Sequence, residues 1–264
     1  MNVLIPTDFS ENAYNAISYV YKHFVPKKTK ITIVHTIKEP HSTSTILLRI
    51  EDLMKKDAEN DMNILLDRIK NEFGHRPNYK IKYGYLKNWL QQYGDSLEID
   101  LVVMGTKGRS NVSSKIMGSV TESVIRSSKK PVLAIPQDIS AEPLHHFVFA
   151  TAYDKLECED FIIELVNSII NKAPVLEILQ VIKPNSDIKV PKSIPFNGLQ
   201  LGVCTINNSN PVNGINDYLE NNRVDILGIF HSRNSRLDYL FNRSITKTIC
   251  GRTKTPLLVI PSKS

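Results

Sequence analysis

A strand, a glycine-containing loop and a helix follow one another in the sequence IDLVVMGTKGRSNVSSKIMGSVTESVI, residues 99–125. Leu101 to Met104 are all apolar, which is typical of a strand buried on both faces of a parallel sheet. The spacing of apolar residues predicts a helix from Val120 to Ser128. Strand, loop and helix in this order form the repeating unit of α/β proteins, so the stretch predicts that fold class.

The rest of the first 138 residues alternates in the same way between β-branched runs and amphipathic segments. Ser10 is a suitable N-cap for a first helix, which Pro26 is expected to end. Open parallel sheets bind ligands beyond the carboxyl ends of their strands, where the strand order reverses. We predict strands at Val3–Ile5, Ile31–Ile37, Tyr79–Tyr85, Leu101–Met104 and Val132–Ile135, and further helices at Thr45–Phe73 and Leu86–Leu97.

The sequence contains an internal repeat. VTESVIRSSKKPVLAIP (120–136) resembles ITKTICGRTKTPLLVIP (245–261), and VLIPTD (3–8) aligns with FVFATA (147–152). We therefore expect two tandem domains, residues 1–138 and 144–264, with a boundary near Gln137 to Pro143. The second copy should lack the long helix of the first, because KPNSDIKVPKSIPFNG (183–198) has no helical period.

The loop after Met104 has the chemistry of a phosphate site. Gly105, Gly108 and Gly118 permit close approach of the backbone to a ligand. The next helix begins with Ser119, Val120 and Thr121, whose N–H groups and two hydroxyls are potential donors to an anion.

Charged residues beside this loop bear on the same interpretation. Lys107 and Arg109 add positive charge, and Asp8 projects from the end of the neighbouring strand. The alternative interpretation is that the glycine loop only connects the strand to the helix. Asp8 favours a binding site over this alternative, which stays open.

Composition and charge narrow the function classes. The chain has 264 residues and a net charge of +6, but its basic residues are interspersed with acidic ones, which argues against a nucleic-acid-binding face. No apolar run is long enough to span a membrane, and MNVLIPTDFS (1–10) lacks the features of a signal peptide, so we expect a cytoplasmic protein. Cys158, Cys204 and Cys250 are too far apart to predict a disulfide framework or a zinc site.

Several of these segments together resemble the universal stress protein family. They are VLIPTDFS (3–10), VVMGTKGRS (102–110), MGSVTESVI (117–125) and PVLAIP (131–136). The nucleotide signature of that family is G-x-x-G, nine residues, then G-S or G-T, which Gly105, Gly108, Gly118 and Ser119 match. The resemblance implies a Rossmann-like, doubly wound sheet of five parallel strands in the order 3-2-1-4-5, present twice as in tandem members.

The resemblance also implies an adenine nucleotide as ligand, with ATP, ADP, AMP and cyclic nucleotides left open. Asp8 matches an acidic residue that helps to hold the adenosine, and Thr36 stands where the family often has a valine beside adenine. His35 matches a usual histidine, to which we assign no chemistry. Mg²⁺ would be bound through the phosphates. The implied ligand-binding residues are Pro6, Thr7, Asp8, Thr36, Met104, Gly105, Gly108, Gly118, Ser119, Val120 and Thr121.

The second copy departs from this signature. Phe230, Arg233 and Arg243 stand in place of the three glycines, and Ala152 stands in place of Asp8, with Asp154 nearby. Bulky side chains should block the close approach of backbone to phosphate, so we expect one nucleotide per chain. Three arginines of this copy, Arg233, Arg236 and Arg243, would hold another anion or form a solvated surface.

Three functions remain open. The first is a nucleotide-binding regulatory protein of the stress response, the second a weak ATPase, and the third a structural interaction module with a vestigial site. The chain has no P-loop and no general base beside the glycines apart from Glu122, so we assign no catalytic residue and no metal site, and expect slow hydrolysis at most. The apolar segments PVLAIP and PLLVIP are expected to pair as edge strands in an internal pseudo-dimer, and a homodimer of whole chains is left open.

Overall fold

The N-terminal half contains a five-stranded parallel sheet. The computed structural model describes residues 1–38, 45–93, 98–108, 117–139, 142–151, 158–170, 174–186, 189–231 and 254–261. The strands lie in the order β3-β2-β1-β4-β5 and all pair in parallel, which confirms the predicted α/β fold and strand order. The elements are β1 (Asn2–Pro6), α1 (Glu11–His23), η1 (Pro26–Lys28), β2 (Lys30–Ile37), α2 (Thr45–Phe73), β3 (Asn78–Tyr83), α3 (Leu86–Tyr93), β4 (Leu101–Gly105), α4 (Ser119–Ser127) and β5 (Val132–Ile135).

The C-terminal half has the same order of parallel strands, β9-β7-β6-β10-β11, with one additional edge strand, β8. β8 pairs antiparallel with β9 and occupies part of the segment in which the sequence indicated no helix. Sequence analysis did not identify this strand. The elements are β6 (His146–Ala150), α5 (Glu159–Ser168), β7 (Val175–Ile182), β8 (Ser193–Phe196), β9 (Leu199–Asn207), α6 (Pro211–Asn221), β10 (Ile226–His231) and β11 (Leu257–Pro261).

The central strand pair has the same register in both halves. In the N-terminal half Val3 lies opposite Leu101, and the Asp100 carboxylate accepts a hydrogen bond from the Asn2 amide at 2.6 Å. In the C-terminal half Phe147 lies opposite Ile226. There the Asp225 carboxylate accepts a hydrogen bond from the His146 amide at 3.0 Å. An aspartate thus fixes the start of the same strand pair in each half.

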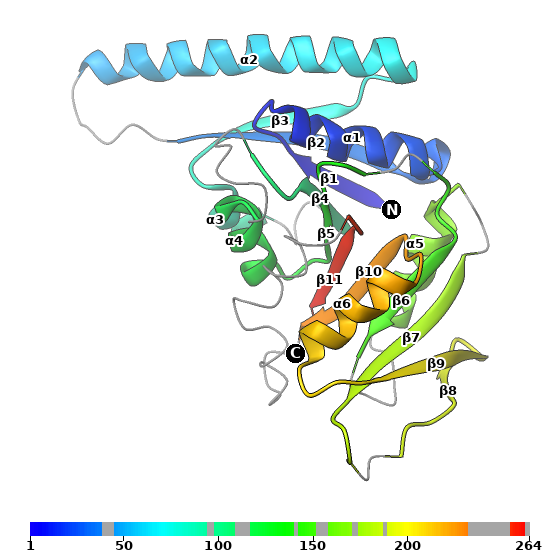
Figure 1. The fold of residues 1–264 in the computed structure, drawn as a ribbon. Coiled ribbons are helices and arrows are strands. Elements are labelled where there is room, and N and C mark those ends of the chain that lie inside the picture. The colour runs from blue at the N-terminus through cyan, green and yellow to red at the C-terminus, as the bar shows by residue number, and fades with distance from the viewer. Residues whose placement is uncertain are drawn as a thin grey trace.

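The two halves share one eleven-stranded sheet (Figure 1). β5 and β11 pair antiparallel at its centre, with Leu133 opposite Leu258. Because this pairing reverses the strand direction, the carboxyl ends of the two sets of strands point in opposite directions.

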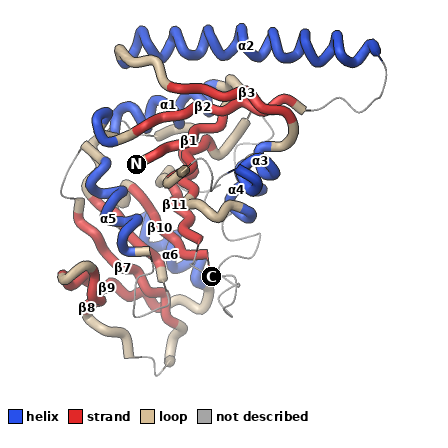
Figure 2. Tube along the Cα trace, turned by 180° about the vertical axis from the view of Figure 1, so that it is seen from behind, coloured by secondary structure: helices blue, strands red, loops and turns tan. Residues whose placement is uncertain are grey.

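Helices cover both faces of the sheet, as a doubly wound fold requires. Residues of α1, α2 and α5 pack into the core on one face, and residues of α3, α4 and α6 pack into the core on the other. The 29-residue helix α2 runs along the outer strands β2 and β3 (Figure 2). Among the described residues, no helix combines the length and apolar character needed to cross a bilayer.

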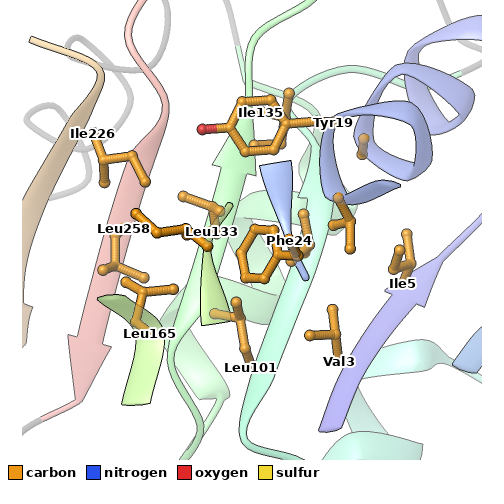
Figure 3. Packing of buried hydrophobic residues seen from close by; sticks show 14 of the residues in the cluster. Val3, Ile5, Tyr19, Phe24, Leu101, Leu133, Ile135, Leu165, Ile226 and Leu258 are labelled. Atoms are coloured by element: carbon orange, nitrogen blue, oxygen red, sulfur yellow. The ribbon is translucent and has the colours of Figure 1, made fainter. Parts of the chain in front are cut away.

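The core on the α1 face is continuous between the halves. Figure 3 shows Leu133 beside Leu258, with Leu165 of the C-terminal half nearby. All three side chains are fully buried. Strand pairing and shared apolar burial therefore hold the halves together.

Truncating the central pair tests this connection. Leu133→Ala and Leu258→Ala should each lower the free energy of unfolding by about 2–5 kcal/mol, because each leaves a cavity in a closely packed core. Leu199→Ala is the matched control, since Leu199 is 66% exposed and should change stability by less than about 0.5 kcal/mol. Urea denaturation would measure all three. Equal stability of the three variants would contradict a shared core at β5 and β11.

Candidate functional site

A cavity of about 610 Å³ lies at the carboxyl ends of β1, β2 and β4, beside the start of α4. This is where the strand order reverses, because β2 flanks β1 on one side and β4 flanks it on the other. The lining of this single cavity includes all eleven residues that the resemblance implied: Pro6, Thr7, Asp8, Thr36, Met104, Gly105, Gly108, Gly118, Ser119, Val120 and Thr121.

The cavity also extends to residues outside the eleven implied positions. Gly84 and Tyr85 follow β3, and the first residues of α3 lie beside them in the lining. Ligands bind at the carboxyl ends of parallel strands, and this rule applies to β3 as well. The sequence could therefore have predicted that residues after β3 line the cavity. The further lining residues are Ala13, Val34, His35, Lys38, Gly84, Tyr85, Leu86, Lys87, Asn88, Lys107 and Ser123.

The turn after β1 fixes the position of Asp8. Phe9 has a positive φ of 62°, which turns the chain sharply before α1. Asp8 Oδ1 accepts hydrogen bonds from the Ser10 amide at 3.1 Å and from the Ser10 hydroxyl at 2.6 Å. The predicted N-cap is confirmed, because Ser10 Oγ in turn accepts a hydrogen bond from the Ala13 amide. The Asp8 carboxylate is therefore anchored at the cavity wall.

His35 lies in the same wall and is oriented by the backbone of β1. Its Nδ1 lies 2.8 Å from the Thr7 carbonyl oxygen, and its ring packs 4.4 Å from the ring of Phe9. Because a carbonyl oxygen only accepts, His35 Nδ1 carries a proton. The ring thereby connects the ends of β1 and β2.

Two loop glycines lie close to neighbouring residues, Gly105 against the backbone of α1 and Gly108 against the Asp8 carboxylate. A Cβ atom at Gly105 would lie 2.4 Å from Asn12 Nδ2 and 2.8 Å from the Asn12 carbonyl oxygen. A Cβ atom at Gly108 would lie 2.8 Å from Asp8 Oδ2. Asn12 Nδ2 also donates a hydrogen bond to the Lys107 carbonyl oxygen at 2.7 Å. The glycines thus let the loop backbone lie against α1 and Asp8.

Helix α4 begins at the cavity with Gly118 as its N-cap, which has no side chain to bond the first amides. The N–H groups of Ser119, Val120 and Thr121 have no acceptor within the helix and are potential donors to a ligand. Val120 is 57% exposed in this first turn. The Thr121 hydroxyl, also expected to be a donor to a ligand, donates to the Gly105 carbonyl oxygen at 2.8 Å in this structure.

The charges around the cavity favour an anion. Lys38, Lys87 and Lys107 line it, and Asp8 is the one acidic residue among the described lining residues. The Lys107 ammonium donates to Gln137 Oε1 at 3.2 Å. Arg109, which the sequence also placed beside the loop, lies outside the described residues.

The corresponding region of the C-terminal half has a different character. Phe230 replaces Gly105, is 9% exposed, and packs its ring 6.1 Å from the ring of Phe149. An aromatic side chain thus occupies the end of β10, where the N-terminal half has glycine. The other residues compared there, Ala152, Asp154, Arg233, Arg236 and Arg243, lie outside the described residues, as does Cys250.

Comparisons with known proteins show the family to which the chain belongs. Residues 1–136 match the sequence model of the universal stress protein family. A universal stress protein of Methanocaldococcus jannaschii is 29% identical over 150 residues, which cover 50% of this chain and 93% of the relative. A second one from the same archaeon is 26% identical over 139 residues, covering 50% and 80%. The solved structure of a universal stress protein from Archaeoglobus fulgidus aligns over 98% of both chains with a TM-score of 0.72 and 16% identity, a likeness of fold.

The close approach at Gly105 generates a prediction. Gly105→Ala should lower the free energy of unfolding by about 1–3 kcal/mol, because the new methyl group overlaps Asn12. Gly202→Ala is the control, since a Cβ atom at Gly202 meets nothing within 4 Å; it should not reduce stability. Thermal and urea denaturation of both variants measure the difference. A Gly105→Ala protein as stable as the control would show that α1 does not constrain the loop.

Proposed function

Because the chain belongs to the universal stress protein family, we propose that its N-terminal half binds one adenine nucleotide and that the protein acts as a cytoplasmic regulator of the stress response. ATP, ADP and AMP are the candidate ligands. The observation that carries the proposal is the meeting of all eleven implied positions in one cavity beside an uncapped helix N-terminus.

The phosphates would lie at the start of α4. The amides of Ser119, Val120 and Thr121 and the Ser119 hydroxyl are donors there, and the helix dipole favours negative charge at this end. Gly105 and Gly108 keep the loop free of Cβ atoms that would meet Asn12 or Asp8. Lys107 adds a positive charge, and Mg²⁺ would be held mainly by the phosphates and water. The donor set therefore fits a nucleotide phosphate chain.

The adenosine would lie toward the ends of β1 and β2. Asp8 Oδ1 is engaged by Ser10, which holds the carboxylate in place as an acceptor for a ribose hydroxyl. Val34, Met104 and Tyr85 supply apolar surface for a base, and Thr36 adds a polar side chain beside it. The cavity volume lies within the range of small-molecule sites.

Binding is favoured over hydrolysis. Asp8 and His35 are the described lining residues with side chains suited to a general base, and each already makes a hydrogen bond within the wall of the site. Efficient hydrolysis also needs a positioned water and stabilisation of the phosphoryl group in the transition state. We therefore propose a nucleotide-dependent regulatory protein with slow hydrolysis at most.

We further propose that residues 1–138 and 144–264 are tandem copies that form an internal pseudo-dimer. The shared register of the β1–β4 and β6–β10 pairs and the antiparallel pairing of β5 with β11 support this proposal. Phe230 stands in the second copy at the position of Gly105, so the second copy lacks a glycine of the signature. This difference supports a single nucleotide site per chain, in the first copy.

Charge at the first turn of α4 provides a test of phosphate binding. Val120→Asp should leave the fold intact, because an acidic residue in the first helical turn stabilises a helix. It should weaken ATP binding by at least about tenfold, equivalent to about 1.4 kcal/mol, through repulsion of the phosphates. Val120→Asn, of nearly equal size and uncharged, is the control and should bind ATP much as the original chain does. Isothermal titration calorimetry measures both, and equal affinities would place the phosphates elsewhere.

A phosphate-release assay separates binding from turnover. With excess Mg-ATP we expect release slower than about 0.01 s⁻¹, a hundredfold below the low end of ordinary enzyme rates. Asp8→Asn should reduce nucleotide affinity. Its rate of phosphate release should stay as slow as that of the original chain, because we do not expect Asp8 to act as a general base. Rapid turnover in the original chain, abolished in Asp8→Asn, would contradict the proposal and favour an ATPase.

A further inference from the structure

A second hollow, of about 400 Å³, lies at the opposite edge of the N-terminal sheet. Residues at the amino ends of β1, β2 and β3 line it, whereas the nucleotide cavity lies at the carboxyl ends. The chain start marked N in Figure 1 is at this edge. We call it the basic hollow after five of its lining residues: Lys27, Lys28, Lys30, His75 and Arg76.

The charge of the basic hollow is one-sided. Three lysines, an arginine and a histidine line it, and none of its described lining residues is acidic. Lys27 and Lys30 form no ion pair with any described residue. The nearest carboxylate to Arg76 is that of Asp67, whose oxygen is 3.8 Å away. The Met1 ammonium, also in the lining, is paired with Glu164 at 3.2 Å. Lys27 and Lys30 therefore supply the uncompensated positive charge, which favours an anion in the hollow.

Neighbouring residues hold several of these side chains in place. Lys28 Nζ donates to the Asn167 carbonyl oxygen at 3.2 Å, and Arg76 Nη2 donates to Asn63 Oδ1 at 2.9 Å. His75 Nδ1 lies 3.3 Å from the Tyr21 hydroxyl. These contacts use a small part of the donors, because a lysine has three N–H groups and an arginine has five. The remaining donors are available to a ligand with several oxygen atoms.

One hydroxyl of the lining residues does not contribute to the open surface of the hollow. Thr29 Oγ1 is buried and has no hydrogen-bond partner among the described residues. Thr29 lies between Lys28 and Lys30 in the lining. Because this oxygen is shielded from solvent, the donors open to a ligand in the hollow are those of the lysines, Arg76 and His75.

We propose that the basic hollow binds a small polyphosphate group. Several oxygens on one short chain match the remaining lysine and arginine donors, and charge-assisted hydrogen bonds of this kind are strong. The volume suits a chain of a few phosphates, whereas a nucleic acid requires a basic surface extending along a longer face. The group is either a free inorganic chain or the tail of a nucleotide.

Titration of inorganic triphosphate into the full-length Val120→Asp protein tests the proposal. That background weakens the phosphate contacts proposed at α4, and the lysine variants below then separate binding in the basic hollow from any binding left at the nucleotide site. We expect binding of one equivalent, with changes in the amide NMR signals of Lys27 to Lys30 and of His75. Lys27→Gln/Lys30→Gln should weaken binding by about tenfold or more. The control Lys55→Gln/Lys56→Gln removes the same charge from the exposed surface of α2 and should retain the affinity within about twofold.

The outcomes are distinct. Weaker binding in 0.3 M salt than in 0.05 M salt would support an electrostatic site. If ATP also binds in the basic hollow and loses affinity in Lys27→Gln/Lys30→Gln, the ligand is the tail of a nucleotide. If inorganic triphosphate binds there and ATP does not, the ligand is a free inorganic chain. Equal losses in the two double variants, signal changes confined to other residues, or no binding at low salt would overturn the proposal.

Discussion

The parallel pairing of β1 with β4 is the constraint on which the site depends. The Asp100 carboxylate and backbone hold Asn2 at the start of this pair, so that Pro6 and Gly105 end at the same edge of the sheet. β2 lies on the far side of β1, and the strand order reverses at this point. The cavity is a consequence of that reversal, because the connections leave the sheet on opposite faces.

The same pairing in the C-terminal half shows that a common fold does not by itself provide a common site. Asp225 binds the start of β6 as Asp100 binds the start of β1. At the other end of the pair, however, Phe230 packs against the ring of Phe149, whereas Gly105 allows α1 to approach the strand end. Stability requires the apolar strands of both halves, whereas the phosphate binding that we propose would require the glycines and the free helix N-terminus of the N-terminal half.

Much of the fold was predictable because buried parallel strands and amphipathic helices have strong periodicities. The bounds of α2 and β5 match the prediction, whereas β8 was missed because residues 183–198 were examined only for a helical period. A signal was present in Asn197-Gly198, both with positive φ, which is typical of a two-residue hairpin turn. Proline is tolerated there because β8 is an edge strand. The cavity wall at Tyr85 and Lys87 was missed because the rule that ligands bind at the carboxyl ends of strands was applied to β1, β2 and β4 and not to β3. The hydrogen bond of the Thr121 hydroxyl to Gly105 depends on tertiary geometry that no local pattern encodes.

Native mass spectrometry of the purified chain, followed by denaturing release and identification of the ligand, tests the central claim most directly. The account predicts one adenine nucleotide per chain, either retained from expression or taken up from Mg-ATP. Two nucleotides per chain would contradict the assignment of the site to the N-terminal half alone. No uptake at millimolar Mg-ATP, equivalent to a binding free energy weaker than about −4 kcal/mol, would contradict nucleotide binding itself.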